Sequence, residues 1–304
     1  MLTPDIEVML RELLRHTFGT DVEIASHVIA NQRHDYVVLL AHLIHPTLDV
    51  SIKLAGPEAP FVQPFDRAAM LHRLVAAQTT IPMAEILAVD TYRTEVPWQY
   101  LIKTLIPGQE WAAVRQRMSR NELRYGYEAI GQAVAQLHAI HLPGFGEITA
   151  TGSLASSGTL LNALVQRAER MITNQRSTEI FLSVLHKHAA LFLDVRASSL
   201  CHDDLHGHNI LFHHQDGQWK LATILDFDKA WAGHHESDLA RLDLWTGMTG
   251  DGFWPAYEAV YPVASLYRQR RPIYQLLWCL EYGATTPKHL ADTRRVYEEL
   301  GLQG

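Results

Sequence analysis

The sequence is short of cysteine, with only Cys201 and Cys279 among 304 residues. Two cysteines cannot build a disulfide-stapled scaffold, and their scarcity favours a reducing compartment, so we expect a cytoplasmic protein. Positive charge is also short: 26 lysines and arginines stand against 33 aspartates and glutamates, giving a net charge of −7. This balance argues against nucleic-acid binding, which depends on a basic face. No apolar run approaches the length of a membrane span and no signal peptide is evident, so we expect neither a nucleic acid nor a membrane as a partner.

The overall composition is that of a folded protein. Hydrophobic residues make up 47% of the chain and charged residues 19%. This composition suits a core of normal size and excludes disorder of the whole chain. The 18 histidines invite a metal-site interpretation, which is weighed below.

The apolar periodicity changes near residue 103. The first part contains two helical patterns and five β-rich runs, which predict helices over 5–16 and 65–77 and strands over 22–30, 36–43, 50–54, 86–92 and 98–106. The second part is mainly helical. It includes an amphipathic helix over 121–141, which Ser119 or Asn121 could cap, and a β insert within 199–231. We therefore predict an α+β fold of two lobes, a β-rich lobe over 1–103 and a larger helical lobe over 104–304.

The densest polar cluster lies in the β insert. It reads His202-Asp-Asp-Leu-His-Gly-His-Asn-Ile-Leu211 and is followed by Asp226-Phe-Asp228. Asp204, Asn209 and Asp226 supply the oxygen groups that phosphoryl transfer needs: a carboxylate for the incoming hydroxyl, and a carboxylate with an amide oxygen for Mg²⁺. Lys53, on a predicted strand of the other lobe, is placed to meet nucleotide phosphates.

These residues resemble the catalytic loop and the metal-binding segment of kinases. In detail they resemble the aminoglycoside phosphotransferase family of small-molecule kinases, whose loop usually reads His-Gly-Asp-Leu-His-x-x-Asn-Ile-Leu. The segment Gly233-His-His-Glu-Ser-Asp-Leu-Ala240 is also similar to the one that follows the metal-binding aspartate in that family. The resemblance implies a bilobal protein-kinase-like fold and an enzyme that transfers phosphate from ATP or GTP, with Mg²⁺, to a hydroxyl group of a small molecule.

The resemblance also implies residue roles. Asp204 would be the catalytic base, and Asn209 and Asp226 would hold Mg²⁺. Lys53 would reach the α- and β-phosphates. The roles implied for the remaining residues are adenine contacts from the backbone at Lys103, Thr104 and Leu105, and structural support of the catalytic loop by His202 and Asp238.

Two departures from the family pattern concern nucleotide binding. The helix after the lysine strand usually reads Arg-Glu, and that glutamate pairs with the lysine. Here Arg67 is followed by Ala68, so either another acid, such as Asp66 or Glu85, pairs with Lys53, or Lys53 lacks that partner. The loop over 30–35, expected to cover the nucleotide, also contains no glycine, although glycine makes it easiest for backbone N–H groups to surround phosphates.

The acceptor pocket is expected among the C-terminal helices. Aromatic residues are frequent there, and acids could bind the ammonium groups of an aminoglycoside. The candidate acids are Glu236, Asp243, Asp251, Glu258 and Glu281. We predict that Asp243, Trp278 and Glu281 line the pocket. The segment after residue 233 is also similar to fructosamine kinases, a related branch, so a ketosamine or another metabolite stays open as the acceptor.

Two other classes stay open. His202, Asp203, His206 and His208 could form the metal site of a phosphohydrolase, although such sites usually draw ligands from helices. A degenerate kinase that binds nucleotide without turnover is suggested by the missing glutamate and glycines. The paired histidines at 213–214 and 234–235 are expected at the surface.

Overall fold

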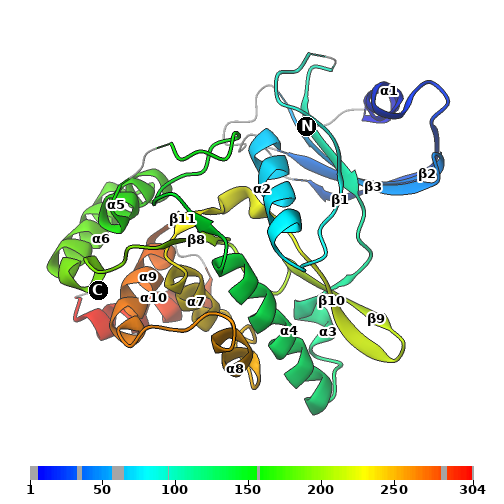
Figure 1. The fold of residues 1–304 in the computed structure, drawn as a ribbon. Coiled ribbons are helices and arrows are strands. Elements are labelled where there is room, and N and C mark those ends of the chain that lie inside the picture. Colours follow the sequence, from blue (N-terminus) through cyan, green and yellow to red (C-terminus); the bar gives the residue numbers. More distant parts are fainter. Residues whose placement is uncertain are drawn as a thin grey trace. The chain divides into compact units, whose positions relative to one another are not determined.

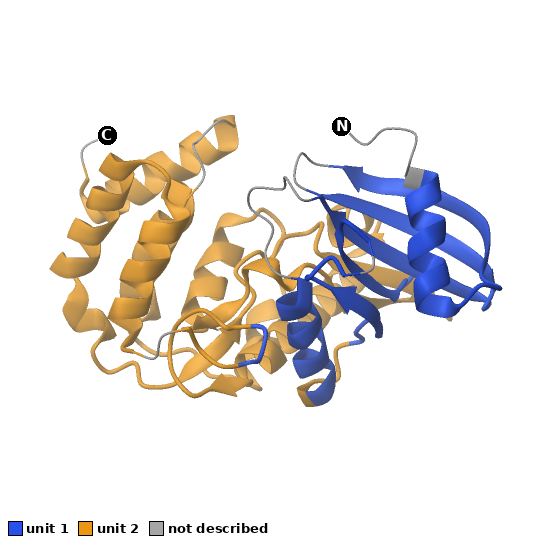
Figure 2. Ribbon diagram, turned by 90° about the horizontal axis from the view of Figure 1, so that it is seen from above, with its two compact units in different colours: residues 1–77, 82–107, 150–152 blue, residues 78–81, 108–149, 153–304 orange. Residues whose placement is uncertain are grey.

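The computed structural model describes residues 6–32, 36–56, 65–94, 96–155, 158–281 and 286–302. The chain divides into two compact units, coloured separately in Figure 2. The first comprises residues 1–77, 82–107 and 150–152, and the second comprises residues 78–81, 108–149 and 153–304. Residues 104–107 therefore group with the β-rich unit.

The first unit is built on a five-stranded antiparallel sheet with the strand order β1-β2-β3-β5-β4 (Figure 1). Its elements are α1 (Ile6–Phe18), β1 (Glu23–Gln32), β2 (Val37–His45), β3 (Leu48–Ala55), α2 (Phe65–Gln78), β4 (Ile86–Asp90) and β5 (Gln99–Thr104). All seven predicted elements of this lobe are present, with ends shifted by a few residues.

Helix α1 and the sheet share one hydrophobic core. Leu10, Leu13 and Leu14 recur at helical spacing and are fully buried. They cluster with alternate residues of the central strands, including Ile52 and Ile102, because every second side chain of a strand points to the same face. Burial against α1 therefore selects which face of β3 and β5 is apolar.

The second unit is mainly helical. Its helices are α3 (Trp111–Val114), α4 (Arg120–His138), α5 (Leu160–Met171), α6 (Gln175–Lys187), η1 (Ala189–Phe192), η2 (Phe227–Lys229), α7 (Glu236–Leu244), α8 (Phe253–Glu258), α9 (Tyr267–Glu281) and α10 (Pro287–Leu300). Ser119 caps α4 as predicted, in a capping box with Glu122. None of the helices in the described part of the chain is long and apolar enough to cross a membrane.

Two three-stranded sheets, with the orders β10-β9-β6 and β11-β8-β7, complete the second unit. Their strands are β6 (Gln109–Glu110), β7 (His141–Leu142), β8 (Ser198–Cys201), β9 (Ile210–Gln215), β10 (Gln218–Ile224) and β11 (Trp231–Gly233). Strands β8, β9 and β10 were predicted. The other three have two or three residues each, too few for a period-two pattern to be recognised. The predicted combination of a β-rich lobe and a larger helical lobe is confirmed.

Candidate active site

The pairing of β9 with β10 brings the two predicted metal-binding residues together. Ile210 lies opposite Ile224 in the antiparallel register. The ladder continues by one bond, in which the Leu225 N–H donates to the Asn209 carbonyl at 2.8 Å. Asp226 follows directly, so residues 17 positions apart in the sequence meet at one end of the hairpin. The Asn209 side chain then reaches the catalytic loop, because its Nδ2 donates to the Asp204 carbonyl at 2.9 Å.

The side chain of His202 connects the segment at Leu225 with the backbone at Asp204. It is fully buried, and its Nε2 lies 2.8 Å from the Leu225 carbonyl, to which it can only donate. Its Nδ1 then accepts from the Asp204 N–H at 3.2 Å. A single neutral tautomer satisfies both bonds, so no ring nitrogen of His202 is left to bind a metal.

Asp238, on α7, receives the backbone of the catalytic loop. Its two carboxylate oxygens accept from the N–H groups of His202 and Asp203 at 2.7 and 2.8 Å. His138 lies 3.2 Å away through Nε2, and its Nδ1 lies 2.7 Å from the Tyr257 hydroxyl. Burial alone would raise the pKa of Asp238, but the hydrogen bond and charge of His138 hold it below its ordinary value. A carboxylate ionised at neutral pH therefore supports the loop.

Charged side chains gather around Asp204. Lys229 Nζ and Arg241 Nη1 each lie 4.0 Å from its Oδ1. Both cations are anchored by Glu281, the last residue of α9, whose carboxylate accepts from Lys229 and from Arg241 at 2.9 Å each. The side chains of Arg241 and Glu281 are 4% and 6% exposed, so this ion pair is shielded from solvent, whereas Lys229 is partly exposed. The sequence motifs gave no indication of this arrangement, because its members come from three separate helices.

Asp203 completes this network on the other side. It pairs with Arg167 of α5 and lies 3.6 Å from Arg241 Nη1. Arg167 also donates to Glu147 at 2.7 Å. Burial would lower the pKa of Arg167, but the charges of Asp203 and Glu147 raise it above the ordinary value. Arg167 is therefore a fixed buried cation.

The oxygen donors at the end of the hairpin fit Mg²⁺. Since the Asn209 amide uses its nitrogen toward Asp204, its Oδ1 is the atom left to act as a ligand. No hydrogen bond to the Asp226 carboxylate is found among the described residues, and the side chain is partly exposed. A carboxylate and an amide oxygen that compete with no protein donor are hard ligands of the kind that Mg²⁺ prefers.

In the β-rich unit, Lys53 lies on β3 between β2 and β5, opposite Val38 and Leu101. Its ammonium group stands over two aromatic rings, 4.5 Å from the centre of Tyr36 and 5.6 Å from that of Phe65. Such cation–π contacts help to hold the ammonium group in place. Sequence reasoning searched for an acid at this position and missed the aromatic neighbours.

The segment predicted to contact adenine uses its backbone donors within the same unit. The Thr104 N–H donates to the Glu85 carbonyl at 3.0 Å, and the Leu105 N–H donates to the Asp49 carbonyl at 2.8 Å. Lys103 precedes them on β5, opposite Ser51. Any backbone contact from Thr104 or Leu105 to adenine would therefore have to use a carbonyl oxygen.

The three residues predicted for the acceptor pocket occupy different surroundings. Glu281 belongs to the ion pairs beside Asp204. Trp278 is buried and stacks on His289, with 4.7 Å between ring centres. Asp243 lines a cavity to which neither Trp278 nor Glu281 contributes. Only Glu281 is thereby associated with the catalytic loop.

The expectation of surface positions for His234 and His235 is wrong. Their exposed fractions are 4% and 7%, because α7 packs against α9 at this point. His234 Nδ1 lies 2.7 Å from the Tyr274 hydroxyl, and burial lowers the pKa of His234 to about 3. Both carboxylate oxygens of the neighbouring Glu236 accept from Arg270, at 2.5 and 2.6 Å, so this acid is occupied by a guanidinium.

Comparison with known proteins identifies the family. The model of the phosphotransferase enzyme family matches residues 47–273. The chain belongs to this family. No curated protein has a sequence that matches the chain. The predicted resemblance, the kinase-like fold and the assignment as a phosphotransferase enzyme are confirmed.

Solved structures agree with this phosphotransferase fold. A thermostable mutant of the aminoglycoside phosphotransferase APH(4)-Ia, in a ternary complex with AMP-PNP and hygromycin B, superimposes with a TM-score of 0.67 at 14% identity, covering 96% of each chain. A complex of gentamicin with APH(2")-IIa has a TM-score of 0.63 at 16% identity, covering 100% of this chain and 98% of that one. Plasmodium vivax ethanolamine kinase gives 0.62 at 14% identity, covering 98% and 88%.

One position sets this phosphotransferase apart from the usual family loop. The residue before Asp204, the predicted base, is commonly glycine, and here it is Asp203, with φ at +62°. Left-handed backbone is costly for residues with a Cβ atom, although Asp and Asn tolerate it better than most. Asp226 has the same value of φ. The carboxylate of Asp203 faces two buried arginines. Glycine has no side chain and could not provide this carboxylate.

Proposed function

We propose that the protein transfers the γ-phosphate of ATP, in the presence of Mg²⁺, to a hydroxyl group of a small molecule. The observation that carries the proposal is the hydrogen-bonded connection of Asp204, Asn209 and Asp226 at the end of the β9–β10 hairpin. The solved relatives in complexes with AMP-PNP or ADP support the use of a nucleotide, and GTP is the alternative donor. The free, buried cysteines Cys201 and Cys279 agree with a reaction in the cytoplasm.

Asp204 is suited to orient and deprotonate the acceptor hydroxyl. Its side chain is partly exposed, whereas the backbone on either side is held by His202 and Asn209. Lys229 and Arg241 lie 4.0 Å from the Asp204 carboxylate and compensate its charge. Their ion pairs with Glu281 prevent them from approaching Asp204 more closely. A base positioned by such fixed partners loses little entropy when the hydroxyl arrives.

Asn209 and Asp226 are the residues that would hold Mg²⁺. When bound, the ion neutralises charge on the nucleotide phosphates. We propose Lys53 as a further phosphate contact, because its ammonium group is positioned over the rings of Tyr36 and Phe65.

The phosphohydrolase alternative loses support from the histidines of the loop. Both ring nitrogens of His202 are used within the protein, and His208 Nδ1 lies 2.6 Å from Glu110. The degenerate-kinase alternative loses support from the paired arrangement of Asn209 and Asp226. Neither alternative is favoured by a specific contact.

The charges of the helical unit favour an acceptor with few ammonium groups. An aminoglycoside would need several available carboxylates, but those near the loop are engaged. Glu236 is bound by Arg270, and Glu281 by Lys229 and Arg241. These pairings support a ketosamine or another neutral or singly charged metabolite over an aminoglycoside.

Site variants test the proposed reaction. We expect Asp204→Ala to reduce turnover by about 10²–10⁴-fold, the usual contribution of a general base, while binding of Mg²⁺·ATP persists. Asp226→Asn should instead weaken nucleotide binding only when Mg²⁺ is present. Asp216→Asn, at a residue that is exposed on the hairpin turn, is the matched control and should leave both quantities unchanged. Unchanged turnover in the Asp204 variant would remove the base from the mechanism.

An acceptor screen tests the charge argument. Phosphorylation is measured with aminoglycosides, macrolides, ketosamines, and sugar and amino alcohols. We expect kcat/KM to be highest for a neutral or singly charged acceptor. A preference for aminoglycosides would refute the inference drawn from the paired carboxylates and would leave the phosphotransferase assignment intact.

A further inference from the structure

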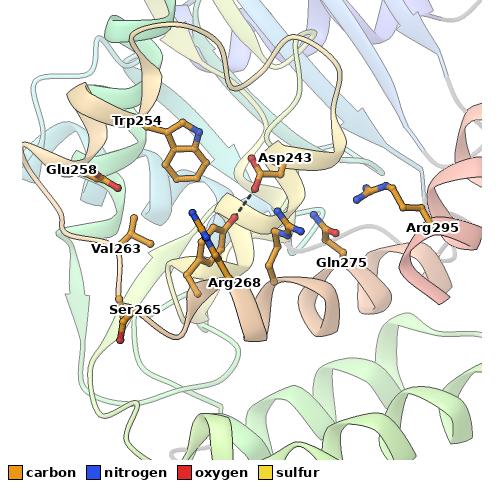
Figure 3. A pocket seen from close by; sticks show the side chains of 11 residues that line it. Asp243, Trp254, Glu258, Val263, Ser265, Arg268, Gln275 and Arg295 are labelled. Atoms are coloured by element: carbon orange, nitrogen blue, oxygen red, sulfur yellow. Dashed lines mark hydrogen bonds between the residues drawn. The ribbon is translucent and has the colours of Figure 1, made fainter. Parts of the chain in front are cut away.

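The helical unit contains a cavity that the catalytic loop does not line. Its volume is about 620 Å³, within the range of about 300–1,000 Å³ that is typical of sites for small molecules. Figure 3 shows its lining side chains, which come from α7, α8, α9, α10 and the segment between α8 and α9. None of Asp204, Asn209 and Asp226 is among them.

Arginine is the commonest residue of the lining. Arg268 and Arg271 lie three positions apart on α9, a spacing that places both on one face of the helix, and Arg295 comes from α10. Two carboxylates, of Asp243 and Glu258, stand against the three guanidinium groups. The lining thus carries one more cation than anion, and Arg271 also donates through Nη2 to Glu299 at 3.0 Å.

The carboxylate of Asp243 is bound by a neighbouring tyrosine. The Tyr267 hydroxyl donates to its Oδ2 at 2.8 Å, drawn as a dashed line in Figure 3. Burial raises the pKa of Asp243, against the lowering effects of Tyr267 and Arg271. The carboxylate of Asp243 is therefore engaged within the wall of the cavity.

Two buried polar atoms at the cavity have no partner within the described residues. Gln275 is 1% exposed, and its Nε2 donates to the Ala240 carbonyl at 2.9 Å, whereas its Oε1 accepts no hydrogen bond. The Nε of Arg271 is also buried without an acceptor. Buried polar groups are nearly always satisfied. A ligand that brings both an acceptor oxygen and a hydroxyl donor would satisfy the two atoms together.

We propose that this cavity binds a small hydroxylated anion. Its carboxylate or phosphate group is held by Arg268, by Arg295 and by the Nε of Arg271, and a hydroxyl group donates to Gln275 Oε1. The indole of Trp254 provides an apolar wall for the carbon skeleton of the ligand (Figure 3). Guanidinium groups bind planar carboxylates and phosphates through paired charge-assisted hydrogen bonds, which explains the choice of arginine.

Anion binding is measured by isothermal titration calorimetry at constant ionic strength, with inorganic phosphate, citrate and tricarballylate as probes. Tricarballylate is citrate without its hydroxyl group. We expect saturable binding of citrate or of phosphate. Tighter binding of citrate would identify the anionic group of the ligand as a carboxylate, and tighter binding of phosphate would identify it as a phosphate. If neither phosphate nor citrate binds to the wild-type protein, the proposal is overturned.

Variants locate the binding. The double variant Arg268→Gln/Arg295→Gln changes two exposed side chains, so folding is preserved, and should weaken binding by about tenfold or more. Arg294→Gln is the matched control, because this exposed arginine adjoins Arg295 on α10 but does not line the cavity. Equal binding by the double variant and the control would place the anion elsewhere, for example at the nucleotide-binding residues, and would refute the proposal.

The hydroxyl contact has its own test. Wild-type protein should bind citrate several times more tightly than tricarballylate, and Gln275→Leu should remove that preference without abolishing anion binding. A preference that survives in Gln275→Leu would show that the amide oxygen does not receive the hydroxyl.

Discussion

Replacing Asp203 by glycine should destabilise the protein, although glycine is the usual family residue there and suits the backbone better. Asp203 has φ at +62°, and relief of left-handed backbone for a residue with a Cβ atom contributes about 1 kcal/mol. Considered alone, this effect predicts a more stable variant. The side-chain contacts predict the opposite.

The carboxylate of Asp203 is 8% exposed and faces Arg167 and Arg241, which are 2% and 4% exposed. Removing one partner of a buried ion pair costs about 3–5 kcal/mol, because the remaining charge stays buried. We use the lower end, since Arg167 keeps Glu147 at 2.7 Å and Arg241 keeps Glu281 at 2.9 Å. After the gain from the backbone, Asp203→Gly should lose about 2 kcal/mol of unfolding free energy.

Urea unfolding at neutral pH measures this loss. Asp203→Ala is the companion variant: it loses the same carboxylate and keeps the backbone strain, so it should be about 1 kcal/mol less stable than Asp203→Gly. The stability order is then wild type, glycine variant, alanine variant. A glycine variant as stable as the wild type would refute the reasoning, because the ion pairs would then contribute no more than the strain costs.

Three further predictions follow from other contacts. Glu281→Gln removes the carboxylate that binds Lys229 and Arg241, so both cations can approach Asp204, the proposed base. We expect kcat to fall by about tenfold in steady-state assays, and CD-monitored melting checks the folding. His234 has a pKa of about 3 against an ordinary 6.5, and the pKa of His235 is also lowered by burial. Below pH 6.5 the unfolded chain therefore binds protons that the native state does not bind. The free energy of unfolding should fall from pH 6.5 toward pH 3 by up to about 1.4 kcal/mol per pH unit for each histidine. Urea midpoints measured at several pH values should depend less steeply on pH in His234→Gln than in the wild type. In Gly131→Ala, the new Cβ would lie 2.5 Å from the Phe253 carbonyl oxygen, so thermal unfolding should show a loss of about 1–3 kcal/mol despite the higher helix propensity of alanine.

Much of the fold could be predicted from the sequence. The apolar repeat of α1, the alternation in β2 and β3, and the Ser119 capping box are local patterns whose hydrogen bonds close within a few residues. The same holds for the turn between β9 and β10, which sets the register and thereby joins Asn209 to Asp226. Local chemistry was sufficient for these features.

The electrostatics of the site depended on tertiary structure. Glu281 lies 52 positions from Lys229 in the sequence and 40 from Arg241, and nothing in its own neighbourhood indicates a partner. Asp203 finds Arg167 at a separation of 36 residues. The interaction of two charges depends on their distance and burial, and both are set by helix packing across the unit.

The sequence by itself determined the family and the two-lobed fold, because the motif that marks the family is a short-range spacing within a strand–loop–strand unit and the fold follows from local periodicity. Tertiary structure alone decided that Glu281 restrains two cations beside Asp204, that His234 and His235 are buried, and that three arginines converge on a separate cavity. The physical reason is that burial and ion pairing are properties of packed helices, and the same residue serves as a solvated acid or as half of a buried pair according to what the fold places opposite it.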